Sequence, residues 1–141
     1  MHFLHLEDSP SDFELIQDQL RSRWPDCIIT RVAARKDYEE EVLRGGFDAI
    51  LSDYTLPSYN GLAALAFARE HRPEKPFVYV SGTIGEERAI EAIKAGAADY
   101  IIKDRPKRLV SAIETAFVQI ERESARRRSD RATSGSTPAS R

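Results

Sequence analysis

Short apolar runs alternate with longer segments of helical periodicity along the chain, as far as about residue 120. The apolar runs are rich in Ile, Val, Leu and Phe, residue types that favour strands. A continuous run such as FVYVS, which has no polar alternation, is typical of a strand buried on both faces. Strands are therefore predicted at residues 2–6, 27–32, 47–52, 77–81 and 99–103.

Five helices are predicted between and after these strands. The first has Ser9 at the capping position and Pro10 at the first helical position, and it ends before Pro25. Thr83 and Glu86 have capping-box spacing at the start of the fourth helix. The residues expected to face the core are Phe13, Ile16, Leu20 and Trp24 in the first helix, Tyr38 and Val42 in the second, Ala89, Ile90 and Ile93 in the fourth, and Leu109, Ile113, Ala116 and Ile120 in the fifth.

The alternation of strands and helices predicts an α/β fold. We expect a five-stranded parallel sheet that is doubly wound, with helices on both faces. Residues 1–122 are predicted to form this single domain. From about Glu123 the chain is rich in Arg, Ser, Thr, Gly and Pro and has no apolar periodicity. Residues 123–141 are therefore predicted to be a basic tail that becomes disordered after a frayed helix end.

Composition and charge narrow the functional classes. A hydrophobic content of 41% and a charged content of 31% are ordinary for a globular domain, and the lone Cys27 fits a reducing compartment. No apolar run approaches membrane-spanning length and the start does not resemble a signal peptide, so we expect a cytoplasmic protein with no membrane contact. The net charge is −2, made up of +3 in residues 121–141 and −5 in the preceding 120 residues. An acidic body with a short basic tail lacks the clustered basic face of a nucleic-acid-binding protein, so no direct DNA binding is expected.

Polar and charged residues follow four of the five predicted strands. Glu7 and Asp8 come after the first strand, Asp53 after the third, Ser81 at the end of the fourth and Lys103 at the end of the fifth. In an open α/β sheet, ligands bind beyond the carboxyl ends of the strands. We therefore expect these side chains to form one site.

The acidic residues of this site favour a hard cation. Two carboxylates about 4 Å apart repel each other by roughly 4 kcal/mol at an effective dielectric constant near 20. Mg²⁺ takes one or two carboxylates together with waters and phosphate oxygens. We expect Asp8 and Asp53 to be direct ligands and Glu7 to act through a water molecule. Beside Mg²⁺ and Lys103, an aspartate such as Asp53 can act as a nucleophile toward phosphorus.

The order and spacing of this set carry a family resemblance. The residues concerned are Glu7-Asp8, Asp53 with Pro57 and Gly61 downstream, Ser81-Gly82, and Lys103 preceded by Tyr100. Over about residues 2–120 the chain resembles the receiver domain of two-component response regulators. The resemblance implies a flavodoxin-like sheet with strand order 2-1-3-4-5.

The resemblance also implies roles for individual residues. Asp53 would accept a phosphoryl group from the phosphohistidine of a histidine kinase or of a histidine phosphotransfer protein. Glu7, Asp8, Asp53 and the backbone carbonyl of Thr55 would hold Mg²⁺. The protein would assist its own phosphorylation and dephosphorylation, and would not be an enzyme acting on other substrates.

The remaining implied roles concern the response to phosphorylation. Ser81 would contact the phosphoryl group, Lys103 would pair with it, and Tyr100 would turn inward as an aromatic switch. The partner-binding face would consist of the fourth helix, the fifth strand and the fifth helix, and would bind a downstream protein, with a homodimer left open. About 20 tail residues are too few for a helix-turn-helix module, so a stand-alone receiver is expected.

One departure from the family and three alternative functions complete the picture. The family usually has proline after the lysine, whereas this chain has Asp104, so a trans peptide bond is predicted between residues 103 and 104.

A receiver-like module that binds proteins without phosphorylation remains an alternative. An aspartate-nucleophile phosphatase usually has a second acid where this chain has Thr55. A flavodoxin-like cofactor binder is disfavoured because Glu7 and Asp8 would repel its phosphate.

Overall fold

A computed structural model describes residues 1–82 and 85–136 of the chain. Within these residues, five strands alternate with α-helices, as the sequence pattern predicts. The strands are β1 (His2–Leu6), β2 (Ile28–Val32), β3 (Ala49–Ser52), β4 (Phe77–Ser81) and β5 (Asp99–Ile102). The helices are α1 (Pro10–Arg23), α2 (Arg35–Arg44), α3 (Gly61–His71), α4 (Glu86–Lys94) and α5 (Leu109–Ser136), with the 3₁₀ helix η1 (Pro106–Arg108) before α5.

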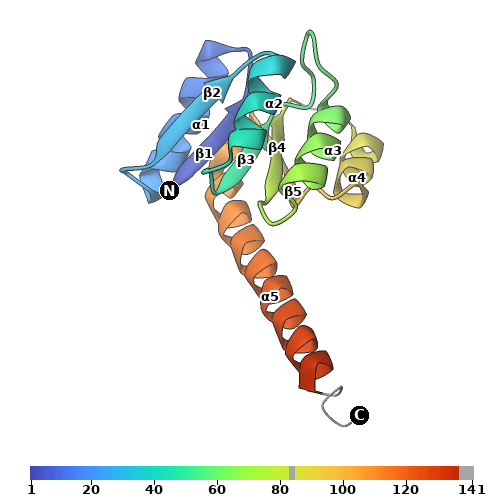
Figure 1. Ribbon diagram of the computed structural model, residues 1–141. Helices are drawn as coiled ribbons and strands as arrows, with labels where there is room; N and C mark the ends of the chain where they lie inside the picture. Colours follow the sequence, from blue (N-terminus) through green and yellow to red (C-terminus); the bar gives the residue numbers. More distant parts are fainter. Residues whose placement is uncertain (83–84, 137–141) are drawn as a thin grey trace.

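The strands form one sheet in the order β2-β1-β3-β4-β5, and all neighbouring strands are parallel. This order confirms the predicted doubly wound, flavodoxin-like fold (Figure 1). Because every strand points the same way, all five carboxyl ends lie at one edge of the sheet.

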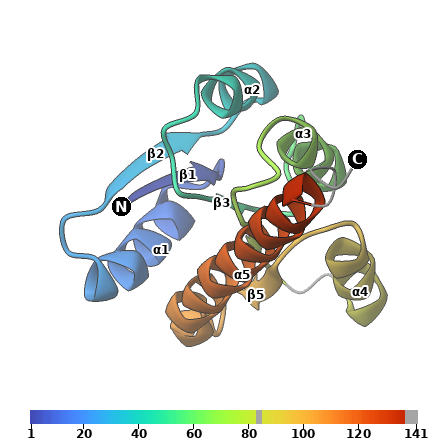
Figure 2. The same ribbon diagram turned by 60° about the horizontal axis from the view of Figure 1, so that its bottom comes forward.

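Two hydrophobic cores lie on opposite faces of the sheet. One contains side chains from α2, α3 and α4, including Tyr38, Val42 and Leu65. The other contains side chains from α1 and α5, including Ile16 and Ile113. Figure 2 shows α1 beside α5, with α2 and α3 across the sheet from them. The strands are therefore covered on both faces, which accounts for their continuous apolar sequences.

Helix α4 does not pack as its sequence pattern predicts. Ala92 is fully buried and Ala89 partly buried, whereas Ile90 and Ile93 are 47% and 45% exposed. Successive helical residues are rotated by about 100°, so the alanines three apart face the sheet and the isoleucines three apart lie on a neighbouring face. The predicted inward stripe of Ala89, Ile90 and Ile93 is thus wrong for both isoleucines. Thr83, the predicted cap, lies outside the described residues, and Gly85 is at the N-cap position.

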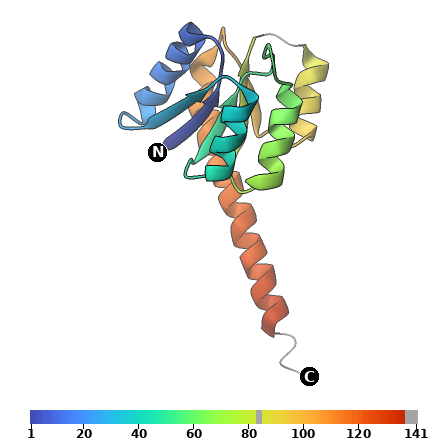
Figure 3. The same cartoon turned by 45° about the horizontal axis from the view of Figure 1, so that its top comes forward.

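Helix α5 is much longer than predicted. It continues to Ser136, well beyond the frayed helix end that the sequence predicts from about Glu123, and residues 137–141 lie outside the described part. The predicted disorder of the tail stays a prediction. At 1.5 Å per residue its 28 residues span about 42 Å, and its second half projects from the body of the fold (Figure 3). Arg, Ala and Glu are good helix formers, so a helix without an apolar stripe can still persist there. Within the described residues, no helix has the length and apolarity of a membrane span.

Gly61 fixes the loop that follows β3. A Cβ atom at this position would overlap the carbonyl oxygen of Tyr54 and lie 2.9 Å from its Cα. Asn60 caps α3 by accepting hydrogen bonds from the Leu62 and Ala63 amides. The buried Tyr79 hydroxyl donates to the Gly61 carbonyl at 2.6 Å. The loop between Asp53 and α3 is therefore held by close backbone contact.

Gly61→Ala should destabilise the fold, because the added methyl group forces Tyr54 and the loop apart. Overpacking of this kind costs about 1–3 kcal/mol of unfolding free energy, to be measured by urea denaturation. Gly82→Ala is the control, since no described atom lies within 4 Å of the Cβ added there. Equal stabilities of the two variants would contradict this account of Gly61.

Candidate functional site

The sheet register places the predicted site residues together. Leu6 pairs with Ser52, and Ser81 pairs with Ile102, so neighbouring strands end at the same level. The Asp53 amide donates to the Leu6 carbonyl at 3.0 Å, and the Lys103 amide donates to the Ser81 carbonyl at 2.8 Å. Side chains that are far apart in sequence thereby begin from adjacent points at the carboxyl edge.

Asp53 lies at the centre of this site and is only 6% exposed. One carboxylate oxygen, Oδ1, accepts hydrogen bonds from the Ser81 hydroxyl and from the Thr55 amide, the latter at 3.1 Å. The other, Oδ2, lies 2.9 Å from Lys103 Nζ. Both oxygens therefore have donors, which hold the carboxylate in a defined orientation.

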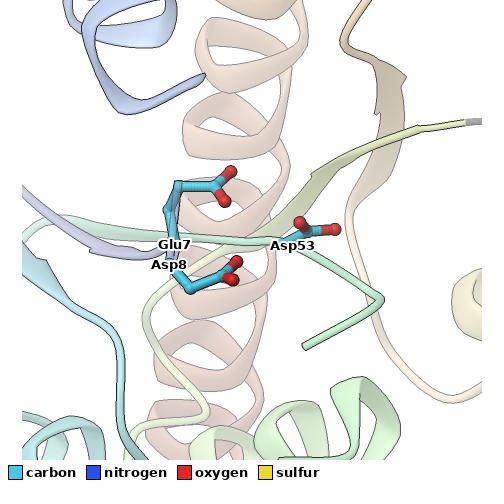
Figure 4. Close-up of side chains that lie close together, drawn as sticks. All are labelled: Glu7, Asp8 and Asp53. Atoms are coloured by element: carbon cyan, nitrogen blue, oxygen red, sulfur yellow. The ribbon is translucent and has the colours of Figure 1, made fainter. Parts of the chain in front are cut away.

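Glu7, Asp8 and Asp53 form an acidic cluster. A carboxylate oxygen from each lies within 4.8 Å of the others, and the carboxylates of Glu7 and Asp8 point toward Asp53 (Figure 4). Glu7 is fully buried, and this burial raises the pKa of its carboxyl group. Asp8 is exposed, so the cluster opens to solvent on its side. Three oxygen donors at this spacing suit a hard divalent cation such as Mg²⁺. The predicted role of the Thr55 carbonyl stays a prediction.

Lys103 binds three carboxylates at once. Its Nζ atom lies 2.8 Å from Glu7 Oε1, 2.8 Å from Asp12 Oδ2 and 2.9 Å from Asp53 Oδ2. Burial alone would lower the pKa of this lysine, but the three hydrogen-bonded carboxylates outweigh burial and raise it above its usual value. The ammonium group therefore stays charged at all physiological pH values.

Tyr100 is half-buried on β5, beside the site. Its hydroxyl donates a hydrogen bond to the Gly82 carbonyl, directly after Ser81. Burial raises the pKa of Tyr100, so its hydroxyl remains a donor at neutral pH. The peptide bond between Lys103 and Asp104 is trans, as predicted from the missing proline. The aromatic ring is thus linked to the loop that follows Ser81, a position consistent with the predicted switch.

His5 is a buried titratable group next to the site. It is 0% exposed, and neither ring nitrogen has a hydrogen-bond partner among the described residues. Its ring stacks on Phe13 at a centroid distance of 5.5 Å. Burial, followed by the positive charge of Lys103, lowers the pKa of His5 from 6.5 to about 3. The imidazole is therefore neutral in the folded chain at neutral pH.

Asp12 and His5 are the site neighbours that the sequence pattern does not reveal. Asp12 has the position of an ordinary acidic residue in the first turn of a helix, which is common without any site. His5 is one polar residue within an apolar strand. A clue to Asp12 exists only once α1 is placed at the same sheet edge as Lys103. All seven predicted site residues lie at this sheet edge.

Comparisons with known proteins point to one family. A family model described as the response regulator receiver domain matches residues 3–114. Response regulator protein PilR of Pseudomonas aeruginosa is 30% identical over 100 residues, which cover 71% of this chain and 22% of that protein. The chain thus spans about a fifth of the length of the curated relatives it matches.

Two solved structures are similar in fold. A CheY-like response regulator receiver domain protein from Methanospirillum hungatei has a TM-score of 0.75 at 23% identity, covering 86% of this chain and 97% of that one. A beryllofluoride-activated NtrC4 receiver domain dimer has a TM-score of 0.75 at 21% identity, covering 84% and 98%. These likenesses support the fold.

His5→Leu should change how stability depends on pH. Below pH 6.5 the unfolded chain protonates His5, while the folded chain keeps it neutral down to about pH 3, so this contribution to stability is complete above 6.5 and declines as the pH falls. By pH 5 the wild type should lose about 2 kcal/mol through this residue alone. The unfolding free energy of the variant relative to that of the wild type should therefore increase by this amount between pH 7.5 and pH 5, as measured by urea denaturation.

Carboxyl groups that titrate in the same pH range affect the stability of variant and wild type alike, so their contribution cancels in the difference between the two. His71→Leu, which removes a histidine from the exposed end of α3, reports the effect of removing a surface imidazole. A stability difference between His5→Leu and wild type that stays constant from pH 7.5 to 5 would show that His5 is not held neutral.

Proposed function

Because the chain belongs to the response regulator receiver domain family, we propose that Asp53 is its phosphoryl acceptor in two-component signalling. The observation that carries this proposal is the convergence on Asp53 of Lys103, the Ser81 hydroxyl and the carboxylates of Glu7 and Asp8. Receiver domains in general are phosphoacceptors, and this chain has the groups that such chemistry requires at one sheet edge.

In the proposed reaction, a carboxylate oxygen of Asp53 attacks the phosphorus atom of a phosphohistidine. The new P–O bond forms as the P–N bond breaks, and the imidazole leaves with the electron pair and remains on the donor protein. Lys103 and the Ser81 hydroxyl already bond to Asp53, so they are placed to donate to the phosphoryl oxygens. Fixed donors of this kind stabilise the negative charge of the transferred group.

The acidic cluster would hold the cation for this reaction. Glu7, Asp8, Asp53 and the carbonyl of Thr55 are the proposed ligands of Mg²⁺. A bound Mg²⁺ neutralises charge on the phosphoryl oxygens and lowers the repulsion between phosphodonor and carboxylates. Asp8 contributes from the exposed side of the cluster, which leaves the approach to Asp53 open to a donor.

The proposed donor is a histidine kinase or a histidine phosphotransfer protein. An aspartate-nucleophile phosphatase usually has a second acid where this chain has Thr55, and the Thr55 side chain supplies no carboxylate for acid-base catalysis. A protein-binding module without phosphorylation would have no use for the Lys103, Ser81 and acidic groups around Asp53. Both alternatives are therefore less well supported than phosphoryl acceptance.

The proposed output surface consists of α4, β5 and the first half of α5. It presents Ile90 and Ile93 of α4 and Val118 of α5, all of them 45–47% exposed, and Tyr100 connects it to the site. The added phosphoryl charge would shift this surface between two arrangements. A second copy of the chain is one candidate partner, since a similar solved structure is a receiver domain dimer. We also propose that the receiver acts without an attached output domain and that the protein is cytoplasmic; both stay predictions.

The wild-type chain should gain one phosphoryl group when it is incubated with acetyl phosphate and Mg²⁺, as measured by intact mass. Asp53→Asn should abolish the gain, because an amide cannot form the acyl phosphate. Asp8→Asn should raise the Mg²⁺ concentration needed for half-maximal rate by about tenfold or more. Asp26→Asn, in the exposed turn before β2, is the control and should be phosphorylated normally. Phosphorylation of Asp53→Asn, or of the wild type in excess EDTA, would contradict the proposal.

Tyr100→Ala should uncouple the output surface from the site. In the wild type, phosphorylation should change backbone amide chemical shifts around Asp53 and also along α4 and β5. In the variant the changes should stay close to Asp53, because no ring links the loop after Ser81 to the surface. Tyr59→Ala, which removes a buried aromatic ring near α2, is the control. The switch assignment fails if Tyr100→Ala leaves the pattern of shifts unaltered.

A further inference from the structure

Asp12 makes a contact that the proposed chemistry does not account for. Its Oδ2 atom lies 2.8 Å from Lys103 Nζ, as close as the Glu7 carboxylate, and the two residues are 91 positions apart in sequence. Asp12 does not belong to the cluster of Glu7, Asp8 and Asp53 that would hold a cation. It therefore contacts the proposed phosphorylation site only through the lysine.

The start of α1 fixes Asp12 in place. The Asp12 amide donates to the Ser9 side chain at 3.3 Å, which caps the helix. The Ser9 amide in turn donates to Glu7 Oε2 at 3.2 Å. The backbone of Asp12 is thus tied to the residues that carry the acidic cluster, and its partly exposed side chain reaches across to Lys103. An anchor of this kind holds its position without help from a bound ligand.

The three carboxylates around Lys103 differ in what phosphorylation demands of them. The ammonium group of Lys103 donates hydrogen bonds to Asp12 and Asp53 and forms an ion pair with Glu7. Glu7 and Asp53 would also be ligands of a cation in the acidic cluster, and in the proposed reaction an Asp53 oxygen would carry the phosphoryl group. Asp12 is not in the acidic cluster and does not react, so its carboxylate could stay bonded to Lys103 when the cation and the phosphoryl group are both bound. It is therefore the only one of the three that can retain Lys103 throughout.

We propose that Asp12 is a positioning residue for Lys103. It holds the ammonium group beside Asp53 while the cation and the phosphoryl group occupy the other two carboxylates. This inference rests on the proposed phosphoryl transfer to Asp53. Asp12 touches no reacting atom and acts through the lysine alone.

The sign of the effect separates positioning from simple charge. Acetyl phosphate is an anion, so removing a negative charge near the site should by itself speed its reaction slightly. Removing an anchor should slow the reaction, because Lys103 then samples positions away from the phosphoryl group. Positioning and through-space repulsion therefore predict opposite changes in rate.

The test compares phosphorylation rates of the full chain with acetyl phosphate at saturating Mg²⁺. Asp12→Asn should slow the reaction by about tenfold, since small misplacements of a catalytic group have effects of this size. Asp12→Glu keeps a carboxylate and should recover most of the lost rate. Glu14→Gln removes the same charge two residues along α1, where the described structure shows no side-chain bond, and should not slow the reaction. In a Lys103→Ala background, Asp12→Asn should cause no further loss.

The outcomes are distinct. If the wild type itself gains no phosphoryl group, the proposed function is wrong. If the wild type is phosphorylated but Asp12→Asn reacts as fast or faster, the positioning role is wrong. Additive losses in the Lys103→Ala background would likewise overturn it, because Asp12 would then act independently of the lysine. Thermal unfolding of each variant confirms that the rates come from folded protein.

Discussion

The attraction between one ammonium group and three carboxylates is the interaction on which this site depends. Glu7 is fully buried and Asp53 nearly so, and two carboxylates about 4 Å apart repel each other by roughly 4 kcal/mol at an effective dielectric constant near 20. Lys103 offsets that repulsion by bonding to both and to Asp12. The site is thus folded and charged before any cation arrives. A cation held by the acidic cluster would share the carboxylates of Glu7 and Asp53 with Lys103.

Packing below the site turns this attraction into a fixed geometry. The strands end in register, and both of their faces are covered by buried side chains. Two buried tyrosine hydroxyls bind α3 to its surroundings: Tyr79 donates to the Gly61 carbonyl and Tyr38 to the Ala64 carbonyl, each at 2.6 Å. The loop that carries Asp53 therefore lies between a rigid strand and a rigid helix. The charges converge because the hydrophobic cores leave the chain little freedom at this edge.

Features that depend on hydrophobic periodicity could be predicted from the sequence. The prediction fails where several apolar residues of one helix could each face the core. Strand order and the residues at strand ends follow from alternation and from the family resemblance. The face of α4 does not, because alanine and isoleucine are both apolar and only the space above the sheet selects Ala92 over Ile93. The extension of α5 escapes prediction because helix propensity alone supports it. Asp12 and His5 escape because their importance arises from contacts between distant elements.

The connection from Lys103 to α5 joins the two ends of the molecule. Lys103 is followed by the short helix η1, and Arg108 at its end donates to the Tyr100 carbonyl at 3.2 Å and to the Asp99 carboxylate at 3.4 Å. The residue directly before α5 is therefore bonded to β5, so the chain segments before and after Lys103 are held together. Because α5 runs back along the sheet and beyond it, any displacement of Lys103 in the proposed phosphorylation would act at the base of a helix about 42 Å long. A small rotation there moves the far end of the helix by a much larger distance than it moves the site.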